Sequence, residues 1–280
     1  MEDDDDVEGI KTEEITPIED LYKTEGFMDR FNEQYGLIKE YRNSHMNAPV
    51  DTMGCAALVD SGVDEKTRRF QSLVSLMLSS QTKDEITARA VNNLKKNNAC
   101  SVEEMDKLTE EEIQKLIYPV GFYKRKATYL KKTCKLLKDK FAGDVPRTVE
   151  ELKSLPGVGP KMAFLCMSIM GETVGIGVDT HVHRISNWLQ WVNTKNPEET
   201  RKQLEKFVPK EEWFVINHML VGFGQTMCKP VAPKCSECPL SSSCHHYQTV
   251  VSEKQQQKKK VKKEEEEEEM EVLVEVEEED

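Results

Sequence analysis

The chain has 280 residues, 38% of them hydrophobic, and carries a formal net charge of −12. No apolar run approaches the roughly 18 to 20 residues that a membrane-spanning helix requires, and the acidic segment 1–8 lacks the character of a secretory or mitochondrial leader. We therefore expect a soluble globular protein that can bury one sizeable hydrophobic core or two modest ones.

The negative charge is concentrated at the two ends of the chain. Residues 1–20 carry a net charge of −9 and residues 251–280 carry −7, which leaves +4 for the segment between them. Neither end shows the apolar periodicity of a packed element, so we predict disordered acidic tails at 1–25 and 249–280. The lysine-rich run at 258–263 is typical of a nuclear localisation signal, although a solvated charge block explains it equally well. The mildly basic remainder permits a polyanionic ligand.

Between the tails, apolar residues recur at the three- and four-residue spacing of amphipathic helices. Stripes of this kind lie at 70–77, 86–94, 127–141, 162–169, 182–189 and 214–221. Strand-like alternation is almost absent, and the apolar stretch Val174–Val178 is short and interrupted by glycines, which indicates a connector. The pattern predicts an all-α fold of about ten short helices.

A glycine-rich turn, Leu155-Pro-Gly-Val-Gly-Pro-Lys161, separates two helical stretches. Its glycines permit a tight hairpin, and a proline is tolerated in the first turn of the helix that follows. Backbone amides at such a helix start bind phosphate without recognising a base sequence, so Gly157, Val158 and Gly159 are candidate contacts to a nucleic-acid backbone. An ordinary helix–helix turn is the alternative.

Lys161 and Asp179 are candidate catalytic residues. A lysine amine attacks carbon only when it is neutral, which requires a partly desolvated site. Asp179 precedes a predicted helix and suits the N-cap position. A carboxylate near an amine can also accept its proton or stabilise a developing cation, and both roles are compatible in one residue.

Four of the eight cysteines lie close together in the sequence, at Cys228, Cys235, Cys238 and Cys244. Four thiolates within 17 residues indicate a metal or cluster site, but the spacing lacks the histidines and the second tight cysteine pair of the usual zinc modules. Ligation by thiolates alone also suits a 4Fe-4S cluster, and the spacing does not decide between iron and zinc.

The segments Leu155–Lys161 and Val178–His181, followed by the four-cysteine spacing, resemble the endonuclease III family of DNA glycosylases. The resemblance extends over about residues 30–248, and Leu76–Asp84 and Tyr118–Ala127 are most similar to the eukaryotic branch. It implies two helical domains with the active site in the cleft between them. These are a six-helix barrel domain with a helix-hairpin-helix motif at 63–173 and an iron-sulfur domain formed by 26–62 and 174–248.

The resemblance further implies a bifunctional DNA glycosylase and AP lyase of base excision repair that acts on oxidised pyrimidines such as thymine glycol or 5-hydroxycytosine. Lys161 matches the family's catalytic lysine, which attacks the sugar C1′, forms a Schiff base and cuts the strand by β-elimination. Asp179 matches the aspartate that assists it. Gln81 and Phe122 match positions that fill the gap left by a flipped nucleotide, although a polar helix end and a packed aromatic ring are their alternatives.

The same resemblance favours a 4Fe-4S cluster on the four cysteines, which would support a loop presenting Lys229 and Lys234 to DNA phosphates and take no part in bond breaking. The implied partner is double-stranded DNA with an oxidised pyrimidine or an abasic site, bound by a monomer. The tails are candidate contacts for downstream repair proteins. We expect the nucleus as the location, with the mitochondrion as a second expectation.

Two other functions remain open at this point. An adenine-mismatch glycosylase of the same fold would carry a catalytic glutamate where this chain has Leu76 and would lack the lysine at position 161. A non-catalytic iron-sulfur or zinc protein that only binds DNA would need neither Lys161 nor Asp179.

Overall fold

The computed structural model describes residues 18–251. Within this range the chain forms twelve α-helices and five short 3-10 or π-helices, and no strand, so the all-α prediction is confirmed. No helix among these residues is long and apolar enough to cross a membrane. The lysine run at 258–263 and most of both predicted tails lie outside the described residues.

The first described helix, η1 (Ile18–Lys23), lies within the segment predicted as an N-terminal tail. The Tyr22 ring stacks on Phe207 with ring centroids 6.3 Å apart. This contact corrects the predicted boundary, because helical structure begins before residue 26. At the other end, η5 (Tyr247–Val251) continues past the predicted boundary at residue 248.

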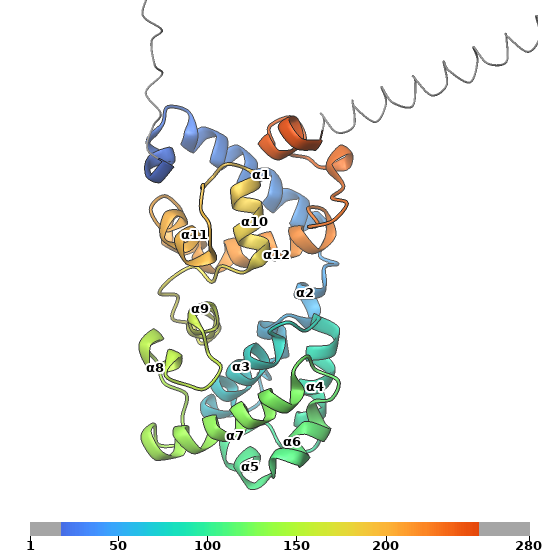
Figure 1. Cartoon of the computed structure of the whole chain (residues 1–280), viewed down its shortest axis with the longest axis vertical. Coiled ribbons are helices and arrows are strands. Elements are labelled where there is room, and N and C mark those ends of the chain that lie inside the picture. Colours follow the sequence, from blue (N-terminus) through green and yellow to red (C-terminus); the bar gives the residue numbers. More distant parts are fainter. Residues whose placement is uncertain (1–17, 252–280) are drawn as a thin grey trace, which may run out of the picture.

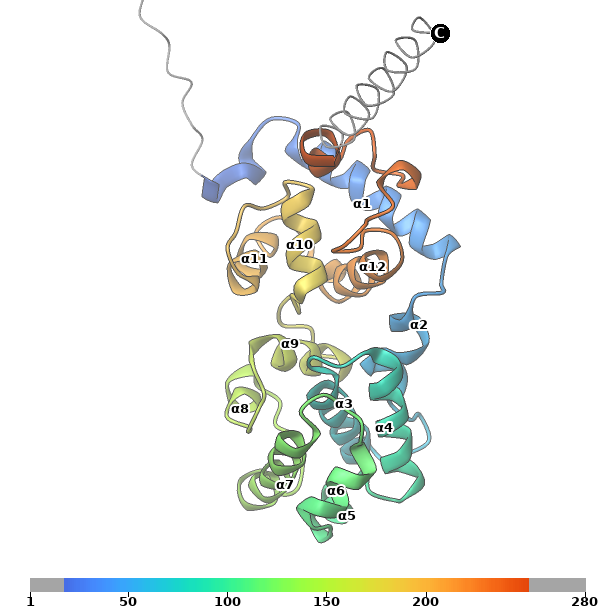
Figure 2. The same ribbon diagram turned by 45° about the vertical axis from the view of Figure 1, so that its right-hand side comes forward.

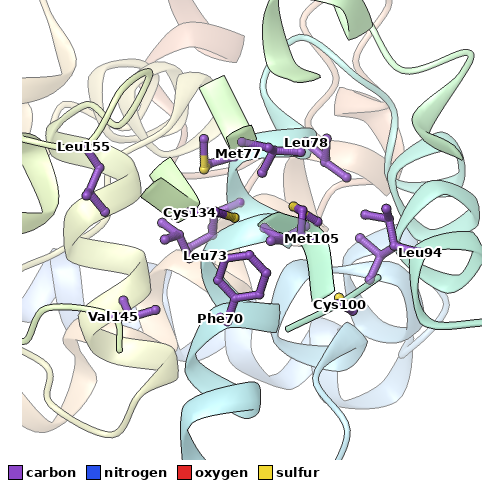
Figure 3. Packing of buried hydrophobic residues seen from close by; sticks show 14 of the residues in the cluster. Phe70, Leu73, Met77, Leu78, Leu94, Cys100, Met105, Cys134, Val145 and Leu155 are labelled. Atoms are coloured by element: carbon purple, nitrogen blue, oxygen red, sulfur yellow. The ribbon is translucent and has the colours of Figure 1, made fainter. Parts of the chain in front are cut away.

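Helices from the middle of the sequence pack into one unit, the middle domain (residues 55–170). Its elements are η2 (Cys55–Leu58), α3 (Glu65–Ser79), α4 (Asp84–Lys96), α5 (Val102–Lys107), α6 (Glu110–Ile117), α7 (Tyr123–Lys140), α8 (Val149–Lys153) and α9 (Pro160–Ile169). All residues of α3 from Arg69 to Leu78 are buried. Figure 3 shows Phe70, Leu73 and Met77 of α3 among side chains from neighbouring helices. α3 is the centre of this core, because every residue from Arg69 to Leu78 is buried in it. Each fully buried apolar side chain of this size contributes about 1.5 to 3 kcal/mol to the free energy of folding.

Short polar residues start several of these helices. Asp64 accepts hydrogen bonds from two backbone amides of α3, and Ser101, Thr109 and Thr148 each accept one from the third residue of the helix that follows. Such caps satisfy backbone donors that have no partner inside the helix. The local sequence therefore determines where these helices begin.

Both ends of the described chain form the second unit, the terminal domain (residues 18–50 and 176–251). Its elements are η1, α1 (Phe27–Ser44), α10 (Thr180–Trp188), α11 (Pro197–Leu204), η3 (Lys210–Glu212), α12 (Trp213–Thr226), η4 (Cys235–Glu237) and η5. Figure 1 shows α1 beside α10 and α12. The buried Gln34 of α1 donates to the Ser243 carbonyl (2.9 Å) and accepts from Trp191 Nε1 (2.7 Å), so α1 is fixed to segments far along the chain.

The chain crosses between the two domains twice (Figure 2). The first crossing contains α2 (Pro49–Met53), in which Val50 packs on the terminal core and Met53 on the middle core. The second crossing is the Val174–Val178 connector, which is neither helix nor strand, as predicted. Leu58 belongs to the middle core, so that core begins before residue 63. The two crossings place residues from both domains around a shared cleft.

Candidate active site

Lys161 and Asp179 face each other where the two domains meet. Lys161 lies in the first turn of α9, and Asp179 is the N-cap residue of α10. Lys161 Nζ is 3.9 Å from Asp179 Oδ2. The other carboxylate oxygen, Oδ1, accepts hydrogen bonds of 2.8 Å from the backbone N–H groups of His181 and Val182. The cap and the ion pair therefore use different oxygens of one carboxylate.

The two side chains differ in their exposure to solvent. The Lys161 side chain is 48% exposed, whereas that of Asp179 is 12% exposed. The protein alone therefore holds the carboxylate in place but leaves the lysine side chain about half exposed to water. Any further desolvation of the amine has to come from a bound molecule.

Both residues line a cleft of about 810 Å³ between the domains. Its walls come from α2, η2, the end of α3, the start of α4, α9, α10 and α12. This volume falls within the range of natural ligand sites and is enough for a nucleobase with its sugar. Leu76 contributes an apolar, nearly buried side chain to the wall.

Asp84, His181 and Gln225 are among the polar residues of the cleft that were not singled out from the sequence. Gln225 of α12 donates from Nε2 to Asp84 Oδ2 (2.7 Å) and accepts from the Val50 backbone amide (3.0 Å). Burial raises the pKa of the Asp84 carboxyl and lowers that of the His181 imidazole. Asp84 and His181 lie in the two segments, 76–84 and 178–181, that carry the family resemblance, whereas Gln225 lies in neither and had no such signal.

Gln81 and Phe122 lie in two loops that touch beside the cleft. Both residues adopt the left-handed backbone conformation, with φ of 50° and 56°. A Cβ on Gly121 would lie 2.5 Å from the Gln81 carbonyl oxygen, so only glycine permits this approach of the two loops. Both side chains are exposed, that of Phe122 to 55%. They are thus available to a ligand and do not line the cleft itself.

A buried lysine connects these two loops. Lys126 Nζ, near the start of α7, donates to the carbonyl oxygens of Leu78 (2.7 Å) and Ser80 (2.6 Å) and to Thr82 Oγ1 (3.2 Å). Thr82 Oγ1 also accepts from the Gly121 amide (3.1 Å). Burial lowers the pKa of Lys126 to about 8. The ammonium group therefore satisfies the carbonyl end of α3 and fixes it against α7.

The predicted hairpin joins α8 to α9. Gly157 has φ +81°, and a Cβ there would lie 2.5 Å from the Tyr129 ring. Val158 is buried and anchors the turn, whereas a Cβ on Gly159 would meet no atom within 4 Å. Gly159 is the N-cap residue of α9 and has no side chain to cap the helix. The hairpin is therefore open to an approaching ligand at the side of Gly159.

The four cysteines Cys228, Cys235, Cys238 and Cys244 line one small cavity together with apolar side chains such as Leu240. Burial and the neighbouring thiols raise the pKa of Cys228 to about 12. Within residues 18–251, no group of three or more His, Cys, Asp or Glu side chains is arranged to hold a single metal ion. The structure thus gathers the four thiols around a common cavity without placing them at one point.

Lys229 and Lys234 lie in the loop between the first two of these cysteines, and both are exposed. Their backbone amides each donate to the Met227 carbonyl at 3.1 Å, which closes the base of the loop. Arg184 Nη2 donates to the Cys228 carbonyl at 2.6 Å and so connects the loop to α10. The loop is therefore held at both the Cys228 backbone and the Met227 carbonyl.

Comparison with known proteins agrees with this arrangement. A family model described as "HhH-GPD superfamily base excision DNA repair protein" matches residues 74–210. The chain is 54% identical over 198 residues to an endonuclease III homolog of Schizosaccharomyces pombe, covering 70% of this chain and 56% of that protein. It is 48% identical over 213 residues to endonuclease III-like protein 1 of Gallus gallus, covering 75% of each.

Among solved structures, a trapped covalent endonuclease III–DNA intermediate has a TM-score of 0.68 and 30% identity, covering 79% of this chain and 98% of that one. The chain belongs to the endonuclease III family. It spans about half the length of the first curated relative, the Schizosaccharomyces pombe protein.

Proposed function

We propose that this protein is a bifunctional DNA glycosylase and AP lyase that removes oxidised pyrimidines from double-stranded DNA. The observation that carries the proposal is the pair formed by Lys161 Nζ and Asp179 Oδ2, 3.9 Å apart in the cleft between the domains. A nucleophile and an adjacent carboxylate in one cleft suit covalent catalysis at a sugar carbon. The covalent DNA intermediate trapped for a relative supports the same type of reaction.

In the proposed reaction, the neutral Lys161 amine attacks C1′ of the damaged nucleotide. The C1′–N bond breaks, and the base leaves with the bonding electrons and takes up a proton. Asp179 accepts the proton that the amine loses and stabilises positive charge on the sugar. The C1′–O4′ bond of the sugar ring then breaks, O4′ takes up a proton from Asp179, and a C1′=N Schiff base to Lys161 forms. The Schiff base loses a C2′ proton, and the C3′–O bond breaks with release of the 3′ strand. Hydrolysis by water frees Lys161.

DNA binding would supply the desolvation of the Lys161 amine that the protein alone does not provide. Lys161 is half exposed, and a nucleotide filling the cleft would displace water from its amine. Extrusion of the base leaves a gap in the duplex, which Gln81 and Phe122 would fill, and the exposure of both side chains supports this role. The amides beside Gly159, at the start of α9, would bind a backbone phosphate.

The cysteine cavity fits a 4Fe-4S cluster. The donor set consists of four thiols, and they surround a shared cavity, as a cluster with several metal atoms requires. When bound, the cluster would cross-link the loop through Cys228, Cys235, Cys238 and Cys244 and hold Lys229 and Lys234 toward DNA. We assign it no part in bond breaking.

Specific observations disfavour the other functions considered from the sequence. In an adenine-mismatch glycosylase the position of Leu76 would be a catalytic glutamate, but here it is an apolar wall of the cleft. A protein that only binds DNA has no need for a lysine and a carboxylate opposed in a cleft. AP lyase chemistry accounts both for the apolar residue at position 76 and for the lysine that faces a carboxylate.

Borohydride trapping tests the role of Lys161. With a thymine glycol duplex, wild type should form a covalent protein–DNA adduct, because hydride reduces the Schiff base to a stable amine. Lys161→Gln should form none. The matched control is Lys153→Gln, a lysine paired with Glu150 on α8 outside the cleft, which should trap like wild type. An adduct that persists in Lys161→Gln would exclude Lys161 as the nucleophile.

Substitution Asp179→Asn separates the two roles of the carboxylate. Asparagine retains a side-chain oxygen that can cap α10, so stability should change by less than about 1 kcal/mol. The charge facing Lys161 is lost, so single-turnover excision should fall by about 100-fold, within the range of general acid–base effects. An unchanged rate would assign Asp179 to capping alone.

A further inference from the structure

A histidine on α12 forms part of the cleft wall. His218 lines the cleft, and its side chain is 32% exposed. Its Nε2 atom lies 3.0 Å from Asp51 Oδ1 of α2. The imidazole therefore connects α12 to the first crossing between the domains.

Asp51 is fixed by groups buried behind it. Its side chain is 3% exposed, and Arg42, whose side chain is fully buried, donates from Nη2 to Oδ1 at 2.5 Å. The other oxygen, Oδ2, accepts from the Ala48 backbone amide at 2.8 Å. A carboxylate paired with a guanidinium can only accept hydrogen bonds.

This environment determines which nitrogen of His218 carries hydrogen. Because Asp51 only accepts, the contact at 3.0 Å places a proton on His218 Nε2. In the neutral imidazole, Nδ1 then has a lone pair and is a hydrogen-bond acceptor. No described residue donates a hydrogen bond to it. A buried ion pair thus holds in place an imidazole with an unused acceptor on the wall of the cleft.

Neighbouring amides on the same wall are already engaged. Asn217 Nδ2 donates to the Gly177 carbonyl, and Gln225 connects the Val50 amide to Asp84. These bonds join segments of the protein and orient those side chains. His218 Nδ1 differs, because its partner at Nε2 orients the ring while leaving the second nitrogen to a ligand.

We propose that His218 is a specificity-determining residue that accepts a hydrogen bond at Nδ1 from the extruded base. The inference rests on the proposed function and names part of its base-recognition site. The matching ligand is a pyrimidine ring with an N–H donor, or with a hydroxyl added by oxidation. The contact acts before the C1′–N bond breaks, so it serves excision of the base. It has no role on a preformed abasic site, where there is no base.

The test compares two substrates with one variant. His218→Phe keeps a planar ring and removes both nitrogens. Single-turnover excision from a thymine glycol duplex should fall about 5- to 30-fold, the usual effect of one lost hydrogen bond and an unpaired donor. Cleavage of a preformed abasic duplex should change less than about twofold. His45→Phe, the same change at an exposed histidine that does not line the cleft, should match wild type on both substrates.

A second variant tests the acceptor itself. In His218→Gln, the amide N–H can bond Asp51 while the amide oxygen offers an acceptor, so excision should recover at least partly relative to His218→Phe. Equal losses on both substrates for both variants would show that His218 serves only the fold and would overturn the inference. Unchanged excision in His218→Phe would overturn it as well. Failure of the proposed function is distinct, because wild type itself would then leave the thymine glycol duplex uncut.

Discussion

A substitution at Gly157 perturbs the hairpin, and the resulting loss in free energy of unfolding can be worked out from the structure. The substitution Gly157→Ala places a Cβ on a residue with φ +81° and 2.5 Å from the Tyr129 ring. A left-handed conformation costs a non-glycine residue about 1 to 2 kcal/mol. Displacing a packed ring costs about 1 to 3 kcal/mol more. We expect Gly157→Ala to lower the free energy of unfolding by roughly 2 to 5 kcal/mol.

Urea unfolding followed by tryptophan fluorescence measures this cost, and the hairpin provides its own control. Gly159→Ala should change stability by less than about 0.5 kcal/mol, because φ is −98° and the added methyl meets no atom within 4 Å. The same methyl lies on the open side of the hairpin, so Gly159→Ala should weaken DNA binding although the fold is unaffected. Gly157→Ala should weaken both.

A double-mutant cycle with Tyr129→Ala separates the two contributions. Removing the ring should abolish the steric part of the Gly157→Ala cost and leave about 1 to 2 kcal/mol for the backbone. If Gly157→Ala were as stable as wild type, or if its cost were the same with and without Tyr129, the reasoning from this contact would be wrong.

Three further outcomes are expected. Phe122→Ala should leave stability within about 1 kcal/mol, because the ring is 55% exposed, but lower thymine glycol excision about tenfold, since stacking on a base is worth about 1 to 3 kcal/mol. Equal excision rates would remove Phe122 from the gap-filling role. Burial lowers the pKa of Lys126 from 10.5 to about 8, so in that window the unfolded chain binds more protons than the folded one. The stability of wild type relative to Lys126→Met should therefore rise between about pH 8 and about 10.5 in urea titrations at each pH, and a constant difference would contradict the lowered pKa. Cys238→Ser should give a protein with less iron, weaker visible absorption and lower DNA affinity than wild type, whereas stoichiometric zinc in a colourless wild type would overturn the cluster assignment.

Local chemistry explains why the helices could be predicted from the sequence. Apolar spacing located the stripe at 70–77, which lies within the fully buried part of α3. Asp179 was recognised as an N-cap from its position before a helix, and the structure shows its side chain accepting from two backbone amides. Such signals depend on residues within a few positions of each other, so they can be recognised in the sequence without knowledge of the fold.

Contacts between distant segments could not be predicted in this way. Asp51 and His218 are 167 positions apart, and Gln225 and Asp84 are 141 apart. Nothing in the local pattern distinguishes these side chains from ordinary surface residues, because their partners are set by how the two domains meet. Tyr22 is a similar case, since its acidic surroundings predicted a tail but Phe207 provides a packing partner. Lys161 and Asp179 were candidates from their own chemistry and helix positions, but only the family resemblance linked them as one site.

The assembly of one domain from both ends of the chain has a consequence during synthesis. The middle domain is complete once residue 170 has left the ribosome, and it can then fold as a unit. The apolar face of α1, with Phe27 and Phe31, has no partner until Trp191 and α12 emerge. At ordinary elongation rates this delay is roughly 10 to 40 seconds. Throughout that interval the nascent chain exposes the hydrophobic face of α1, and in its last part, after residue 170, this helix lies beside a finished domain, so α1 is a segment that a chaperone would have to protect.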